Sequence, residues 1–215
     1  MEVLAAVFNV VSRRSYGELG KTEDTEAKLL ILRMEPDQSS DPDPQVHGKV
    51  VVLTGFPGTG KLTIATKMKS YFPEDTIRLI DNHLLIDPAR AIYPGRSAAH
   101  CELRRKIRKV AFDTIRKIAQ EGKTVLMTAC LVDSKADIRT FEEHISIVRT
   151  TCIPIYWLNL GCDRDVLEKR VTSEERREWG KTKLTNASVL RQMVEDHKLL
   201  NPRPYDYEPA KLIAE

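Results

Sequence analysis

The feature that most constrains the fold is a short apolar run that ends in a glycine-rich turn. Val50 to Thr54 forms the run, which is typical of a strand buried on both faces in a parallel sheet. Gly55-Phe56-Pro57-Gly58-Thr59-Gly60-Lys61 follows at once and fits the GxxxxGK part of the Walker A phosphate-binding loop. In such a loop, backbone N–H groups and the start of the next helix surround phosphate oxygens. The sequence therefore predicts a strand, a phosphate-binding turn and a helix in this order.

Further along the chain, strand patterns alternate with helical patterns. Strands are expected at residues 77–80, 124–129, 153–160 and 211–213, and helices at about 60–71, 97–120, 133–149, 166–171 and 187–200. This alternation predicts an α/β fold, a doubly wound and mainly parallel sheet with helices on both faces, as in P-loop NTPases. Ligands of such sheets bind beyond the carboxyl ends of the strands, so the residues that follow each strand are the candidate site.

Residues 1–46 are expected to form a partly disordered appendage to a globular domain at residues 47–215. The end of the appendage, residues 35–44, is acidic and proline-rich, which is typical of a linker. The apolar stretch at residues 3–11 is predicted to be a frayed or surface-docked helix. A signal peptide is disfavoured because Glu2 precedes this stretch and two arginines follow it.

Composition restricts the classes of partner. The appendage carries five Lys/Arg and nine Asp/Glu, whereas residues 47–215 carry 29 and 22. A mildly basic domain suits phosphorylated ligands, and no nucleic-acid partner is expected. No apolar run approaches the ~18 residues that a membrane span needs, so no membrane partner is expected either. The cysteines form no CxxC pair, which predicts reduced thiols, a cytoplasmic protein and no metal site built from cysteine. The oligomeric state is left open.

The loop departs from the full Walker A pattern at one position. Leu62 stands where Ser or Thr normally ligates magnesium, and Thr63 is rotated from that position by roughly 100° around the helix. This form of the loop resembles that of adenylate kinases, GxPGxGKGT, which also lacks a hydroxyl directly after the lysine. Over about residues 48–213, the chain resembles the broader group of P-loop small-molecule and nucleoside-monophosphate kinases.

The resemblance implies ATP as the nucleotide, with Mg²⁺ held largely through water. Lys61 is expected to reach the β- and γ-phosphates and Thr63 to lie near the α-phosphate. The nucleotide-binding residues implied in this way are Gly55, Phe56, Pro57, Gly58, Thr59, Gly60, Lys61, Leu62 and Thr63.

Candidate acceptor-binding residues follow the strand at residues 77–80. Asp81 resembles the acceptor-binding aspartate of several small-molecule kinases, where it orients a hydroxyl or accepts its proton. His83 is expected to face the acceptor as well, and the alternative for both residues is a cap of the next turn. Among the arginines between residues 90 and 105, Arg104 is the one expected to bind the acceptor. The alternative for Arg104 is a solvated helix face.

Two further arginines resemble those that clamp the migrating phosphoryl group in such kinases. Arg170 corresponds to the leading arginine, and Arg176 to an arginine of a lid near residues 172–186. The alternative is an exposed, charged helix end. A magnesium-orienting acid is harder to find in the sequence, and Asp133 is a candidate that would act through water.

The leading functional interpretation is a kinase that transfers the γ-phosphate of ATP to a small-molecule acceptor. In it Lys61, Asp81, Arg170 and Arg176 are the catalytic residues. Two alternatives stay open: an ATP hydrolase or switch protein that uses the basic helix at 97–120, and a non-catalytic nucleotide-binding relative. Leu62 and the short distance from the last expected strand to residue 215 keep the second of these open. The acceptor is not identified by the sequence.

Overall fold

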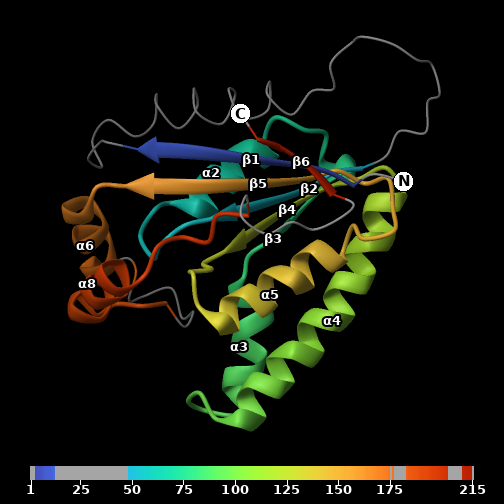
Figure 1. Ribbon diagram of the computed structural model, residues 1–215. Coiled ribbons are helices and arrows are strands. Elements are labelled where there is room, and N and C mark those ends of the chain that lie inside the picture. Colours follow the sequence, from blue (N-terminus) through green and yellow to red (C-terminus); the bar gives the residue numbers. More distant parts are fainter. Residues whose placement is uncertain (1–2, 13–47, 175, 177–182, 203–209, 215) are drawn as a thin grey trace.

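The computed structural model describes residues 3–12, 48–174, 176, 183–202 and 210–214, which contain a six-stranded sheet of order β3-β4-β2-β5-β1-β6. Every strand runs parallel to its neighbours (Figure 1). The strands are β1 (Val3–Ser12), β2 (Val50–Thr54), β3 (Ile77–Ile80), β4 (Thr124–Ala129), β5 (Ile155–Cys162) and β6 (Ala210–Ala214). The parallel α/β fold class expected from the sequence is confirmed.

The helices connect these strands and cover the sheet. They are α2 (Lys61–Lys69), η2 (Glu74–Thr76, a 3₁₀ turn), α3 (His83–Ile92), α4 (Ala98–Gln120), α5 (Lys135–Ser146), α6 (Arg164–Thr172) and α8 (Ala187–Asp196). Side-chain caps start three of them, because Ser97, Ser134 and Asn186 each accept a hydrogen bond from a backbone N–H of the first turn. Helix α3 has no counterpart among the expected helices. It contains Pro88, which normally indicates a break.

Two apolar layers lie on opposite faces of the sheet. Val50 and Val52 pack on the side of α4 and α5, with Phe112 and Phe141 in the same cluster. Val51 and Leu53 alternate with them and belong to the cluster on the side of α2. Both faces of β2 are therefore covered, and this explains why its sequence is apolar without interruption.

The helix expected for the N-terminal apolar stretch is not observed. Residues 3–12 form the strand β1 and not a helix, and this strand lies between β5 and β6. Its register with β5 runs from Ala5 opposite Ile155 to Ser12 opposite Cys162. The stretch is rich in valine, which favours extended backbone, and the outer edge of β5 supplies a row of backbone hydrogen-bonding groups. The expected strand at 211–213 lies within β6, whereas the linker at 35–44 and the domain boundary near 47 lie outside the described residues.

The carboxyl ends of the parallel strands meet at one rim of the sheet. The glycine-rich loop leaves β2 there, Asp81 follows β3, and Cys130 follows β4. Helices α6 and α8 lie together beyond the end of β5, and α3 lies beside the N-terminal half of α4 (Figure 1). Among the described helices, none is both long enough and apolar enough to cross a membrane. The glycine-rich loop and Asp81 therefore lie at the edge of the sheet where ligands of parallel α/β folds bind.

Candidate functional site

The glycine-rich loop between β2 and α2 has the backbone geometry of an anion-binding turn. Gly58 and Gly60 have φ angles of 95° and 87°. Residues with a side chain rarely adopt this region of backbone conformation. Thr59 closes the turn, because its N–H and its hydroxyl both donate to the carbonyl oxygen of Phe56, at 3.2 and 2.9 Å. Successive N–H groups in such a turn converge on a common point, which suits phosphate oxygens.

Lys61, the first residue of α2, folds back over this loop. Its Nζ donates to the carbonyl oxygens of Gly55 (2.6 Å) and Phe56 (2.9 Å), and it is 3.3 Å from Oγ1 of Thr59. Burial is the main cause that lowers the pKa of Lys61 to about 8. Charge interactions with Cys130 and Asp81 oppose the shift, and the charge of Arg176 adds to it. These three side chains therefore lie within electrostatic reach of the lysine.

The lowered pKa leads to a prediction about proton uptake. In the unliganded protein the Lys61 amine is largely neutral above about pH 8, and a bound triphosphate favours its charged form. We therefore expect ATP binding to take up close to one proton at about pH 9 and close to none at about pH 6.5. Calorimetric titrations in buffers of different ionisation enthalpy measure this number. The uptake should vanish in Lys61→Met, and the same uptake at both pH values would contradict the assignment.

Asp81 is held in place by a hydrogen bond between two strand ends. Its side chain is buried, with the residue 7% exposed, and its Oδ1 accepts a hydrogen bond from the Thr128 hydroxyl at 2.9 Å. The same hydroxyl accepts one from the backbone N–H of Asn82, also at 2.9 Å. Thr128 thus links the end of β4 to the turn after β3. This partnership joins residues 47 positions apart and was not predicted, because no local sequence pattern connects them.

Arg170 lies against the loop. It belongs to α6 and is only 8% exposed, so the alternative of an exposed helix end is wrong for this residue. Its Nη1 donates to the carbonyl oxygen of Gly58 at 3.3 Å and is 3.9 Å from the Cys162 sulfur. A Cβ placed on Gly60 would be 3.6 Å from the same Nη1. A cation from α6, the helix that follows β5, therefore flanks the glycine-rich loop.

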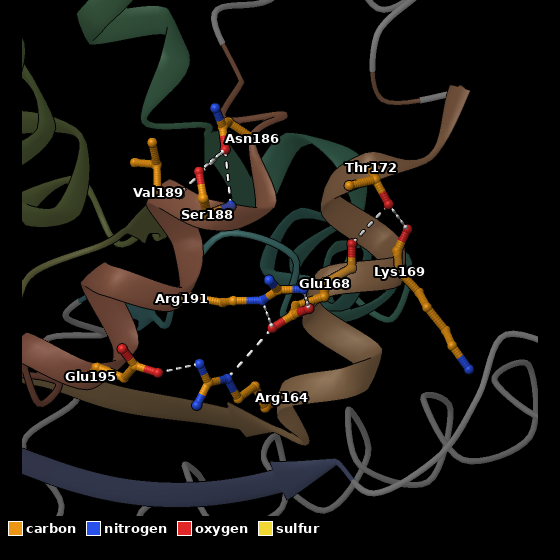
Figure 2. A network of polar contacts seen from close by, with 9 residues as sticks. All are labelled: Arg164, Glu168, Lys169, Thr172, Asn186, Ser188, Val189, Arg191 and Glu195. Atoms are coloured by element: carbon orange, nitrogen blue, oxygen red, sulfur yellow. Dashed lines mark hydrogen bonds and ion pairs between the residues drawn. The ribbon is translucent and has the colours of Figure 1, made fainter.

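A surface network of ion pairs joins α6 to α8 (Figure 2). Glu168 accepts two hydrogen bonds from Arg191, at 2.6 and 2.8 Å, and Arg164 pairs with both Glu168 and Glu195. Beneath it, Leu167, Val171 and Leu190 form a small apolar cluster. The cluster and the network together fix α6, which carries Arg170.

Three further predicted residues, Arg176, His83 and Arg104, belong to other segments of the chain. Arg176 is half-buried and donates from Nε to the carbonyl oxygen of Leu184 at 2.8 Å, and its charge acts on Lys61. His83 lies in the first turn of α3, where its Nδ1 is 3.5 Å from Oδ1 of Asp87. Arg104 is half-buried on α4. Much of the expected lid, residues 175 and 177–182, lies outside the described residues.

The arrangement restricts how a metal ion is held. Leu62 has no oxygen in its side chain, and Thr63 is exposed. The residues that the structure describes include no group of three His, Cys, Asp or Glu side chains that could hold a metal ion. The Oδ1 of Asp133 accepts a hydrogen bond from the backbone N–H of Lys198 and lies 3.3 Å from Nδ1 of His197, and its role through water stays a prediction. Asp81 is the carboxylate within electrostatic reach of Lys61.

Comparisons with known proteins found similarity in structure but not in sequence families. No protein-family model matches the sequence, and no curated protein matches it significantly. Among solved structures, it resembles a chain of the Pnkp1/Rnl/Hen1 RNA repair complex, with a TM-score of 0.51 and 18% identity, over 73% of this chain and 46% of that one. It therefore spans less than half the length of that relative.

Two other solved structures are kinases by name, with TM-scores below 0.5. A sugar kinase from Janibacter sp. matches with a TM-score of 0.44 and 17% identity, over 78% of this chain and 85% of that one. A gluconokinase from Sinorhizobium meliloti matches with 0.41 and 14%, over 79% and 83%. At these identities the likeness concerns the fold alone. The particular resemblance to adenylate kinases stays a prediction.

Proposed function

We propose that this protein is an ATP-dependent kinase that transfers the γ-phosphate of ATP to a small-molecule acceptor. The observation that carries the proposal is the cluster centred on Lys61. This lysine lies inside the glycine-rich loop, Asp81 and Arg176 are close enough to shift its pKa, and Arg170 lies against Gly58. Phosphoryl transfer depends mainly on positioning and on stabilising charge, and the cluster contains the groups that do both.

The loop and its lysine would bind the triphosphate of ATP. Phosphate oxygens would replace the carbonyl oxygens of Gly55 and Phe56 as the partners of Lys61 Nζ, and the loop N–H groups would bind the β-phosphate. Arg170 and Arg176 approach this turn from α6 and from the residues after it. They would stabilise the negative charge on the migrating phosphoryl group.

The donor set near the loop fits Mg²⁺ that enters with ATP. Magnesium commonly keeps several waters and uses one or two carboxylates together with substrate phosphates. Asp81 would supply one carboxylate, directly or through water. Leu62 would supply no ligand, because its side chain contains no oxygen. Bound in this way, the ion would supply positive charge that offsets the charge of the β- and γ-phosphates.

Asp81 would also orient the acceptor hydroxyl. The hydrogen bond from Thr128 fixes the direction of its carboxylate, and its position at the rim places it beside the phosphate-binding turn. An oriented carboxylate can accept the hydroxyl proton as the phosphoryl group is transferred. His83 and Arg104 lie on the next two helices of the chain, and we assign them to acceptor binding.

Asp81→Asn is expected to separate transfer from nucleotide binding. The substitution keeps the shape of the side chain and removes its charge, so kcat should fall by about 10²–10⁴-fold. The Kd for ATP without metal should change little, because the loop holds the phosphates. Thr128→Val serves as the control, since it keeps the carboxylate, removes the hydrogen bonds of the Thr128 hydroxyl to Asp81 and Asn82, and should cause a smaller loss. Retention of wild-type kcat in Asp81→Asn would exclude its catalytic role.

The proposed function is tested by ATP consumption with Mg²⁺ in the presence and absence of hydroxylated acceptors. A kinase consumes ATP faster with its acceptor and forms the phosphorylated product in equal amount. ATP hydrolysis that no acceptor changes would favour the hydrolase alternative. ATP binding without any turnover would favour the non-catalytic alternative. The cytoplasmic location and the absence of nucleic-acid and membrane partners stay predictions.

A further inference from the structure

The outer face of α4 carries an exposed apolar side chain between charged ones. Val110 has the largest exposed fraction, 69%, among the large apolar side chains of the described residues. The residues at helical spacing on either side of it are charged and exposed: Glu102, Lys106, Asp113 and Lys117. These five residues form what we call the outer stripe. Since all five are exposed, none of the described helices and strands covers this side of α4, which lies at the outside of the fold (Figure 1).

The apolar surface at the centre of the outer stripe extends beyond one side chain. Val110 lines a shallow hollow of about 460 Å³ together with Lys106, Ile107 and Ala111. Ile107 and Ala111 are half-buried and pack against the core cluster beneath α4. A small apolar patch of this kind is ordinary on a protein surface, so the charges around it have to identify what it binds.

The charges of the outer stripe are self-complementary. Their order along the helix is negative, positive, valine, negative, positive. A second α4 that runs antiparallel, with the two Val110 side chains in contact, places its Lys117 opposite Glu102 and its Asp113 opposite Lys106. The register of these pairs deviates by only one residue, about 1.5 Å, from that of the valine pair. Two-fold symmetry repeats both pairs, so attractive contacts lie on both sides of the central valines.

The ion pairs within the helix are compatible with this arrangement. Nζ of Lys106 is 2.9 Å from Oε1 of Glu102, and Nη1 of Arg116 is 3.7 Å from Oδ1 of Asp113. A carboxylate has two oxygens and an ammonium group has three donors, so each can bind a further partner. Contact between two copies would join these pairs into networks, which contribute more than isolated exposed pairs.

We propose that the outer stripe of α4 is a dimer interface, on which a second copy of this chain docks with its own α4 antiparallel. The inference goes beyond the proposed kinase function and does not depend on it. A polyanion such as a nucleic acid fits the stripe less well, because Glu102 and Asp113 would repel it. The stripe extends along about 22 Å of helix, so the interface is small and the dimer is expected to be weak, with a micromolar Kd.

Sedimentation velocity of the full-length protein, from about 1 to about 500 µM, tests the proposal. The weight-average mass should rise with concentration from 24.5 kDa toward twice that value. Val110→Asp opposes two carboxylates at the centre of the interface and should raise the dimer Kd about tenfold or more. Val189→Asp is the matched control, because Val189 is an exposed valine of α8 outside the stripe, and this variant should associate as the wild type.

Two results of this experiment would overturn the proposal. One is a monomer at every concentration, and the other is equal association of the wild type and Val110→Asp. A monomer that instead binds an oligonucleotide through Lys106 would assign the outer stripe to a polyanion.

Charge reversals test the antiparallel arrangement itself. Lys106→Glu and Asp113→Lys each oppose like charges in a homodimer, so each should raise the Kd about tenfold or more. An equimolar mixture of the two variants should associate nearly as the wild type does. In the mixed dimer the introduced glutamate faces the introduced lysine, and the unchanged Asp113 faces the unchanged Lys106. Both positions are exposed, so each variant should melt close to the wild-type temperature. A mixture that associates no better than either variant alone would exclude the antiparallel dimer.

Discussion

Lys61→Met is expected to lower the rate of ATP turnover by roughly 10²–10³-fold or more and to weaken ATP binding. The lysine is the cation whose Nζ lies inside the turn, within 2.6–2.9 Å of two loop carbonyl oxygens. Methionine keeps an unbranched apolar side chain of similar length but cannot donate to phosphate. The buried residues of α2 are Ile64, Ala65 and Met68, so the helix should remain packed.

The measurement is steady-state ATP consumption together with the calorimetric Kd for ATP. Lys67→Met is the matched control, because Lys67 lies further along the same helix, with its amine 5.6 Å from the centre of the Tyr71 ring. It should behave as the wild type in both assays. Near-normal turnover of Lys61→Met, at unchanged protein concentration and melting temperature, would contradict both the site and the proposed function.

Gly48→Ala is expected to destabilise the protein by about 3 kcal/mol or more. Gly48 is buried just before β2, and its N–H donates to the carbonyl oxygen of Ala119 at 3.0 Å. A Cβ at this position would lie 2.1 Å from the carbonyl oxygen of Lys123 and 2.6 Å from that of Ala119. Both obstacles are backbone atoms, one at the end of α4 and one directly before β4. Neither can move without disturbing the sheet.

Urea denaturation of both proteins measures this loss of free energy. Gly95→Ala is the control: its φ of 95° costs roughly 1–2 kcal/mol for an L-residue, but nothing lies within 4 Å of the added Cβ. Gly48→Ala should therefore be the less stable of the two variants. A smaller loss in Gly48→Ala than in Gly95→Ala would show that the start of β2 can shift at little cost.

Two strands that are buried on both faces were predicted with their bounds. The expected ranges 50–54 and 124–129 coincide with β2 and β4, because an uninterrupted apolar run between turn residues has few alternatives. The edge strand β3 also coincides with its expected range, 77–80, although it is only partly buried. Helix α4 begins and ends within one residue of its expected range, since Ser97 caps its start and its apolar period is regular. Helix α3 was missed because Pro88 argues locally against it.

The N-terminal stretch shows the limit of local reasoning. An isolated apolar segment of about ten residues is compatible with a helix or with a strand, and only a partner decides between them. The edge of β5 is that partner, and it lies more than 140 residues away in the sequence. The contact between Thr128 and Asp81 and the contact between Arg170 and Gly58 also join residues that are far apart in the sequence. Local patterns therefore could not predict them.

The sequence by itself determined the glycine-rich turn between β2 and α2, because its spacing, its glycines and its lysine all lie within a few consecutive residues. It also determined the parallel α/β class, through the order of its apolar segments. The tertiary structure decided which cations and which carboxylate surround Lys61. Those properties depend on burial and charge among side chains from different strands and helices, and they exist only once the rim of the sheet has formed.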